Sequence, residues 1–177
     1  MSERNGVEIG HCPKRRGVCF RLALAVALVA VAADQITKWV ILEHVMTPPR
    51  LIEVTPFFNL TLGFNSGVSF GFLGGGAANP WLLSGLALAI AVALGAWARR
   101  TDSRSEAAAF GAIMGGAVGN VIDRMRLGAV TDFLDLHAFG WHWPAFNVAD
   151  VGISGGVVLL LLHGWRQGRR PPAGEGA

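Results

Sequence analysis

The sequence predicts an all-α integral membrane protein with four transmembrane helices and a small extracytoplasmic β-rich cradle. Of its 177 residues, 52% are hydrophobic and only 15% are charged, against about 25% charged in an ordinary soluble domain. Four long apolar runs cross the chain, and β-branched and aromatic residues gather between the first two. We therefore expect one membrane domain at residues 20–166, between a basic tail at 1–19 and a flexible tail at 167–177.

The four helices are expected at about residues 20–42, 81–97, 107–123 and 146–165. A helix rises 1.5 Å per residue and the hydrocarbon core is about 30 Å thick, so the second and third runs are slightly short. Asp123 and Arg124 should therefore lie near the lipid headgroups.

The first helix has an alternative interpretation as a cleavable signal peptide. The basic residues Lys14, Arg15 and Arg16 precede an apolar run that ends in small residues, which is typical of such leaders. Apolar residues resume after Asp34, however, and extend the run to spanning length. The sequence therefore favours a membrane helix.

The distribution of Lys and Arg predicts the orientation. Eleven of the fifteen lie in the N-terminal tail, the link between the second and third helices, or the C-terminal tail. By the positive-inside rule, both termini should be cytoplasmic. Asp34, Asp132 and Asp150 then all fall near the outer face of the membrane.

The segment at about residues 43–80 is expected to form the β-rich cradle. Residues 51–54 and 57–62 are rich in β-branched and aromatic side chains, and Pro, Gly and Asn interrupt them. The other outer segment, 124–145, contains Trp141 and Trp143, which suit the interface between membrane and water.

Glycines in the third helix predict close helix packing. Gly111, Gly115 and Gly119 recur at intervals of four, with Gly116 beside them. On a helix this spacing forms a flat strip that lets a neighbouring backbone approach. The strip should hold Asn120 and Arg124 against the other helices.

Polar residues at membrane depth are costly and are therefore candidates for function. Asp34 and Lys38 are four apart and can pair on one helical face. Asn147 and Asp150 are three apart at a helix start, where a carboxylate is favoured. For each pair, structural neutralisation explains the residues as well as chemistry does. Asp132 differs, because it has no adjacent cation.

Two aspartates that meet in space can hydrolyse a peptide without a metal. If Asp132 and Asp150 approach each other, repulsion raises one pKa, so that the pair shares a proton near neutral pH. The pair can then take a proton from water and return one to the departing amine. The five histidines are scattered, without zinc-ligand spacing. We expect no metal, no cofactor and no nucleic-acid partner.

Two other functions remain open from the residues alone. One is a Ser/Lys protease, with Lys38 as base and Ser66 or Ser69 as nucleophile. The other is a transporter or assembly factor in which buried Asp and Lys residues relay protons or simply pair.

Five ordered motifs resemble those of the bacterial lipoprotein signal peptidases (signal peptidase II). They are residues 34–38 (DQITK), 65–70 (NSGVSF), 115–124 (GGAVGNVIDR), 130–135 (VTDFLD) and 146–150 (FNVAD). The match covers about residues 20–166. This chain departs from the family at 68–69, Val-Ser where Ala-Ala is frequent, and at Val151, where Ser is frequent.

The resemblance implies an aspartic endopeptidase of the bacterial cytoplasmic (inner) membrane. Such an enzyme cleaves the signal peptide from diacylglyceryl-modified prolipoproteins immediately before the lipidated cysteine. Its partners would be the lipidated prolipoprotein and membrane lipid, and it would act as a monomer. The resemblance implies that Asp132 and Asp150 are catalytic. The residues that would line the site and hold substrate are Asp34, Lys38, Asn65, Asn120, Arg124 and Asn147.

Overall fold

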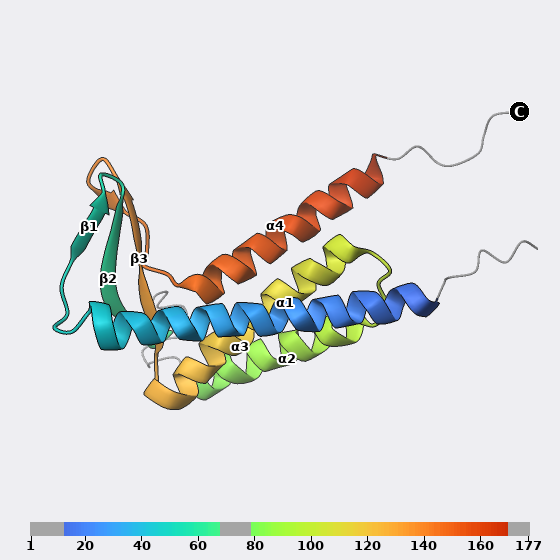
Figure 1. The fold of residues 1–177 in the computed structure, drawn as a ribbon, viewed down its shortest axis with the longest axis horizontal. Helices are drawn as coiled ribbons and strands as arrows, with labels where there is room; N and C mark the ends of the chain where they lie inside the picture. The colour runs from blue at the N-terminus through green and yellow to red at the C-terminus, as the bar shows by residue number, and fades with distance from the viewer. Residues whose placement is uncertain (1–12, 68–78, 170–177) are drawn as a thin grey trace, which may run out of the picture.

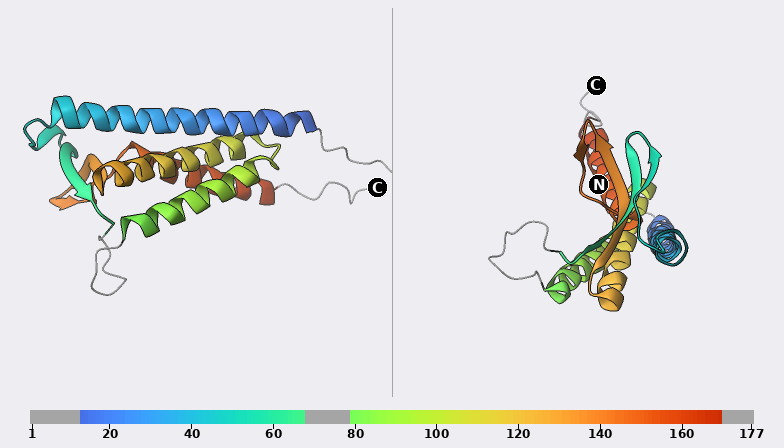
Figure 2. Two further views of the ribbon diagram at one scale, coloured as in Figure 1. Left: turned by 90° about the horizontal axis from the view of Figure 1, so that it is seen from below. Right: turned by 90° about the vertical axis from the view of Figure 1, so that its left-hand side faces the viewer.

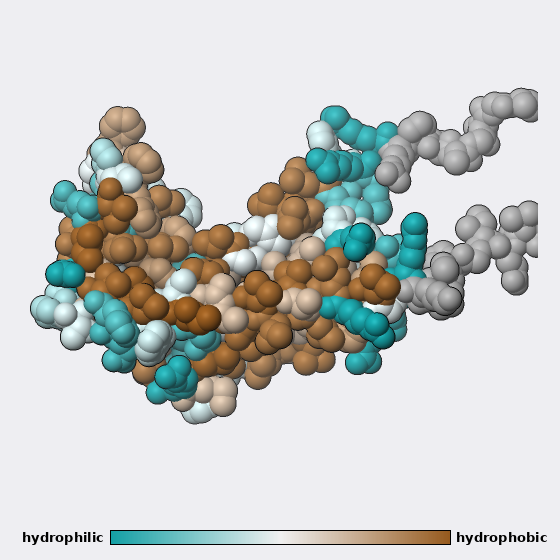
Figure 3. All heavy atoms as spheres, in the orientation of Figure 1, coloured by the Kyte–Doolittle hydropathy of each residue, from teal (hydrophilic) through white to brown (hydrophobic). Residues whose placement is uncertain are grey.

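Four long helices and one antiparallel sheet make up the fold (Figure 1). The computed structural model describes residues 13–67 and 79–169. The helices are α1 (Pro13–Val40), α2 (Pro80–Ala98), α3 (Arg104–Leu127) and α4 (Val148–Gly168). All four are long and apolar enough to cross a membrane, and hydrophobic atoms cover the middle of the bundle (Figure 3). The predicted fold class is confirmed.

Helix α3 is the centre of the bundle and contacts the other three helices. It is 61% buried over its most apolar stretch, against less than a fifth for each of the others. A Cβ added to Gly115 would come within 2.5 Å of the Ala27 carbonyl oxygen in α1, and one added to Gly116 would meet the Ala149 carbonyl in α4. The glycine strip therefore packs as the sequence predicts, against two neighbouring helices.

The helices are longer than the sequence predicts. Helix α1 begins at Pro13, so the second half of the expected basic tail is helical; Pro fits a first turn, and Lys and Arg are good helix formers. Helix α3 begins after Ser103, whose hydroxyl caps the Glu106 N–H, and ends at Gly128, which takes a left-handed conformation. Asp123 and Arg124 thus lie within its last two turns.

The sheet contains β1 (Ile52–Thr55), β2 (Phe58–Asn65), β3 (Val130–Ala138) and β4 (Trp141–His142), paired in that order. Strands β1 and β2 fall in the predicted cradle, but β3 and β4 come from the other outer segment. The prediction was wrong to confine the cradle to 43–80. The first four residues of β3 are all buried, so they lack the polar alternation that marks a strand exposed on one face.

Some predictions concern residues outside the described part of the chain. These are Ser69 and the rest of segment 68–78, the tail up to residue 12, and residues 170–177.

The sheet crosses one end of the helix bundle (Figures 1 and 2). Ile41 and Met46, which follow α1, pack with Phe133 of β3 in one buried cluster. A bulge in β2 sets two residues opposite Phe133 alone, because Leu60 pairs with Leu134 and Gly63 with Asp132. Strand β3 begins after the end of α3, and its Leu134 pairs with Phe146 just before α4, which brings Asp132 toward Asp150.

Candidate active site

Asp132 and Asp150 meet at Asn147, although they come from different elements. Asp132 lies in β3 and is 4% exposed, while Asp150 lies in the first turn of α4. The Asn147 side chain donates from Nδ2 to Asp132 Oδ1 at 2.6 Å, and its backbone N–H donates to Asp150 Oδ2 at 3.3 Å. The Asp150 N–H donates back to Asn147 Oδ1 at 3.0 Å, which completes a capping box. One buried asparagine therefore holds both carboxylates.

The environment of Asp132 disfavours its charged form. Burial raises the pKa of Asp132 from 3.8 to about 6, and the Asp150 carboxylate adds to this rise. Hydrogen bonds from Asn65 and Asn147 and the charge of Lys38 oppose it. Asp132 therefore retains its proton into the mildly acidic range, beside the second carboxylate.

A second acidic cluster surrounds Lys38. Its Nζ lies 2.8 Å from Asp34 Oδ2, 3.0 Å from Asp123 Oδ2 and 3.2 Å from Asn120 Oδ1. Asp34 is fully buried and also accepts from the Ala149 N–H, at 2.9 Å. A carboxylate there complements the N-terminus of α4. Asp34 therefore ties α1 to α4 at the turn that carries Asp150.

Asp123 connects this cluster to the sheet. Its Oδ2 accepts from the Thr131 backbone N–H at 2.9 Å, and its Oδ1 accepts from Gln35 Nε2 at 3.0 Å. Thr131 precedes Asp132 in β3. Asp123 is itself held by its salt bridge to Lys38. Together these contacts fix the position of β3, and so of Asp132, relative to α1 and α3.

Asn120 joins the two groups of carboxylates. Its Oδ1 accepts from Lys38 and, at 3.3 Å, from Asn147 Nδ2. Its Nδ2 donates to Asp150 Oδ1 at 2.9 Å. Because Lys38 and Asn147 both donate to its oxygen, the amide is oriented with its nitrogen toward Asp150.

Asn65 and Arg124 stand at the edge of this network. Asn65 ends β2 and hydrogen-bonds Asp132 through its side chain. Arg124 donates weakly from Nη1 to the Asn120 carbonyl at 3.5 Å, and its buried Nε has no partner among the described residues. No described carboxylate lies within 4 Å of its guanidinium. Arg124 thus keeps donors available beside the aspartates.

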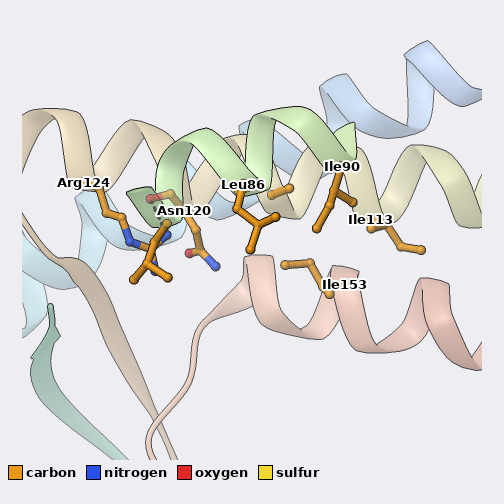
Figure 4. A pocket seen from close by; sticks show the side chains of 9 residues that line it. Leu86, Ile90, Ile113, Asn120, Arg124 and Ile153 are labelled. Atoms are coloured by element: carbon orange, nitrogen blue, oxygen red, sulfur yellow. Dashed lines mark hydrogen bonds between the residues drawn. The ribbon is translucent and has the colours of Figure 1, made fainter. Parts of the chain in front are cut away.

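An open hollow of about 260 Å³ leads from the bundle surface to this edge. Asn120 and Arg124 lie at its polar end, while Leu86, Ile90 and Ile153 line the rest (Figure 4). Helices α2, α3 and α4 contribute the lining. The hollow can therefore receive an apolar chain whose polar end reaches the carboxylate pair.

The structure gathers the eight residues singled out from the sequence into one connected region, but it places them differently. Asp34, Lys38 and Asn147 are at most 3% exposed and lie behind the aspartates. Asn65, Asn120, Arg124 and Asp150 border open space or are half-buried.

Sequence analysis missed Asp123, Gln35 and Thr131 as members of the network. All three lie inside the motifs. Asp123 comes three residues after Asn120 and shares its helical face, so this spacing could have identified it as a member of the site. Asp123 and Arg124 were expected near the headgroups, and the structure turns Asp123 inward instead. Its carboxylate is 4% exposed because Lys38 neutralises it.

The arrangement suits acid–base hydrolysis by the carboxylate pair. A pair that shares one proton offers a base to an attacking water and an acid to the leaving group. It does not suit Lys38 as the base for Ser66, because three contacts already use the three N–H bonds of Lys38. Ser69, the other nucleophile considered, lies outside the described residues.

Comparisons with known proteins agree with this geometry. Residues 26–166 match the family model described as signal peptidase (SPase) II. The chain is 45% identical over 151 residues to the lipoprotein signal peptidase of Methylobacterium sp. (strain 4-46), covering 84% of this chain and 92% of that one. It is 44% identical to the lipoprotein signal peptidase of Methylorubrum extorquens (strain PA1), covering 87% and 91%. A solved bacterial membrane enzyme, at 28% identity, superposes with a TM-score of 0.75, covering 88% and 94%.

Proposed function

Because the chain belongs to the signal peptidase II family, whose members are proteases that cleave prolipoprotein signal peptides, we propose that Asp132 and Asp150 are its catalytic pair. One observation carries the proposal. These two carboxylates are bonded by neutral amide groups, whereas Asp34 and Asp123 bind Lys38. Among the described residues, neither aspartate has a salt-bridge partner within 4 Å, and such a carboxylate pair is the arrangement that retains a proton for catalysis.

In the proposed reaction the ionised carboxylate takes a proton from water as that water attacks the scissile carbonyl carbon. The protonated carboxyl donates to the carbonyl oxygen. Collapse of the tetrahedral intermediate then breaks the C–N bond. The carboxyl that gained the water proton transfers it to the departing amine, and the carboxylate that had donated to the carbonyl oxygen takes that proton back as the C=O bond re-forms. The pair ends with one proton, as it began, and the raised pKa of Asp132 supports its share in holding that proton.

The hollow between α2, α3 and α4 supports a lateral route for the substrate. The signal peptide would enter from the membrane and the diacylglyceryl chains would remain in lipid, so that cleavage falls immediately before the lipidated cysteine. Asn65, Asn120 and Arg124 would donate to the substrate backbone at the polar end. Holding the peptide in the membrane would supply much of the positioning that catalysis needs.

In this proposal three buried residues support the site without contacting the substrate: Asp34, Lys38 and Asn147. Their burial separates them from an entering peptide. Instead, they hold the start of α4 and the Asn120 amide in place. In this proposal the supporting role takes the place of the substrate contact that the resemblance implied for all three residues.

We further propose that both termini are cytoplasmic and that the site lies near the outer face of the inner membrane. The start of α1, the link between α2 and α3, and the end of α4 lie at the end opposite the sheet (Figure 2). Eleven of the fifteen Lys and Arg residues belong to those parts of the sequence or to the tails beyond them. One chain supplies all the site residues, which supports a functional monomer.

The test is cleavage of a diacylated prolipoprotein by purified protein, with the unlipidated twin as a second substrate. Asp132→Asn and Asp150→Asn should each lower the rate by at least about 10²- to 10⁴-fold, the range of a lost acid or base. Asn keeps the size of Asp and one acceptor oxygen, so the variants should still fold, as the monodisperse fraction in detergent would show. Asp102→Asn, at an exposed position in the α2–α3 link, is the matched control. Undiminished cleavage by either site variant would disprove the assignment.

A further inference from the structure

The far tip of the sheet is an aromatic surface. The β1–β2 and β3–β4 turns lie side by side there, because the His137 N–H donates to the Phe57 carbonyl at 3.0 Å. Residues 54–58 and 136–146 include no Asp, Glu, Lys or Arg. The large apolar side chains exposed on these turns form what we call the aromatic tip: Phe57, Leu136, Phe139, Trp141 and Trp143.

Phe139 occupies a backbone position that opposes its residue type. Ala138 pairs with Trp141, so Phe139 and Gly140 form a two-residue turn, and their φ angles are +52° and +78°. Such turns favour Asn, Asp or Gly at the first position, and a positive φ is unfavourable for a bulky side chain. The Phe139 side chain is also fully exposed, at 108%. Neither local conformation nor packing within the protein accounts for a phenyl group at this position.

The neighbouring tryptophans form a pair suited to a membrane interface. Trp141 and Trp143 are 63% and 57% exposed, and their rings meet edge to face at a centroid distance of 5.8 Å. They border a shallow apolar hollow of about 340 Å³ with Phe57 and Leu136. Tryptophan is enriched at headgroup level because its ring is apolar and its N–H is polar.

The position of the aromatic tip relative to the helices indicates which kind of partner it contacts. The sheet rises past the adjacent ends of the helices, on the side of α4 (Figure 1), and hydrophobic atoms reach its far end (Figure 3). Strands at this end run across the helix axes, and therefore along the plane of a bilayer that the helices span. We propose that the aromatic tip inserts into the headgroup region of the leaflet at the sheet end of the bundle.

Insertion at this point would control the position of the site. Strand β3 carries Leu136 at the aromatic tip and Asp132 four residues earlier. A lipid contact at one end of the strand and the Thr131–Asp123 hydrogen bond at the other would fix Asp132 at a constant depth. The sheet would then stay above the membrane entrance to the hollow without a protein partner.

Depth-dependent fluorescence quenching in liposomes tests this proposal. An environment-sensitive fluorophore is attached at Phe139→Cys, or at Phe57→Cys, in the full chain with Cys12→Ser and Cys19→Ala. Glu53→Cys is the matched control, since Glu53 is exposed on β1 of the same sheet. Quenchers are placed either on lipids near the headgroup or as iodide in the water.

The fluorophore at the two tip positions should show blue-shifted emission. The lipid quencher should quench it several-fold more at these positions than at position 53, and iodide should quench it less there than at position 53. Equal iodide quenching at 139 and 53 would overturn the proposal. A blue shift at 139 that is insensitive to the lipid quencher but depends on the protein-to-lipid ratio would also overturn it, and would indicate a second copy of the chain as the partner.

Discussion

Two pairs of carboxylates lie in one hydrogen-bonded network, and they differ in the groups that lie between their members. Lys38 lies between Asp34 and Asp123, within 3.0 Å of both. Among the described residues, the groups that bond Asp132 and Asp150 are amides, and the charges of Lys38 and Arg124 act on this pair from beyond salt-bridge distance. Asp34, Asp123 and Asp132 are similarly buried. The two pairs therefore differ mainly in whether a cation lies within salt-bridge distance of the carboxylates.

This difference separates a structural role from a chemical one. A carboxylate that faces a lysine is favoured in its ionised form. The ion pair then stabilises the contact between the elements that carry the two residues. Between amides, by contrast, Asp132 has a raised pKa, so its proton is retained near neutral pH and is available for acid–base chemistry. Sequence position alone does not distinguish them, since all four aspartates belong to the motifs.

Removing the cation from the compensated pair should have the largest effect. Lys38→Met leaves Asp34 and Asp123 buried without a counter-charge, and breaking a buried ion pair in this way costs about 3–5 kcal/mol. We expect little folded protein, measured as the monodisperse fraction in detergent and by thermal melting. Adding Asp123→Asn should partly restore folding. Arg166→Met, at an exposed position near the end of α4, is the control for loss of charge. Wild-type melting of Lys38→Met would contradict the structural role.

Changing the residue between the proposed catalytic pair should affect the cleavage rate more than stability. Asn147→Ser keeps a good N-cap for α4 but loses the amide that donates to Asp132. We expect cleavage to fall by about 10- to 100-fold, as for a misplaced catalytic group, with a loss of stability smaller than for Asn147→Ala, which removes the cap as well and costs about 1 kcal/mol more. Equal rates for Asn147→Ser and the wild type would show that the side-chain amide does not position Asp132.

The raised pKa of Asp132 should also make the stability of the protein depend on pH. Because the folded pKa of Asp132 is about 6 and its ordinary value is 3.8, the folded state binds the proton more tightly than the unfolded state. This contribution is complete below about pH 4 and is lost as pH rises through about 6. Asp132→Asn lacks it. The variant should therefore gain in melting temperature over the wild type between pH 4 and pH 7. A constant difference across this range would contradict a raised pKa.

The sequence predicted the architecture well because membrane helices follow from composition. Apolar runs of spanning length located α1 to α4, and the glycine interval predicted the packing of α3. Helix ends were less accurate, since α1 continues through Lys14 and Arg15 beyond any membrane. The sheet was half predicted, because the buried start of β3 resembles any short apolar run.

The network was less predictable than the list of its members. The pairing of Asp34 with Lys38 follows from a spacing of four, and the capping box of Asn147 and Asp150 follows from a spacing of three. Asp34 and the Ala149 N–H, by contrast, are 115 positions apart, and no local pattern relates them. The sequence motifs pointed to Asp132 and Asp150, but only the fold shows that Asn147 joins them.

The second aspartate in the sheet gives the finest test of the comparison. Asp135 is 7% exposed and lies three residues from Asp132 in β3, but His142 Nδ1 lies 2.9 Å from its carboxylate and Asn59 donates to it at 3.0 Å. Burial raises the pKa of Asp135, but hydrogen bonds from His142 and Asn59 outweigh burial and leave the pKa below its ordinary value.

Asp135 should therefore behave as a compensated group despite its position. Asp135→Asn is expected to change cleavage by no more than about 2- to 3-fold, since the residue supplies no proton in the mechanism. A lowered pKa contributes stability above the ordinary value of 3.8 that is lost as pH falls through the folded pKa. The variant should thus melt below the wild type at pH 7, and the gap should close on acidification. Cleavage that falls as far as in Asp132→Asn would show that proximity to the site, rather than the lack of a counter-charge, decides which aspartates are essential.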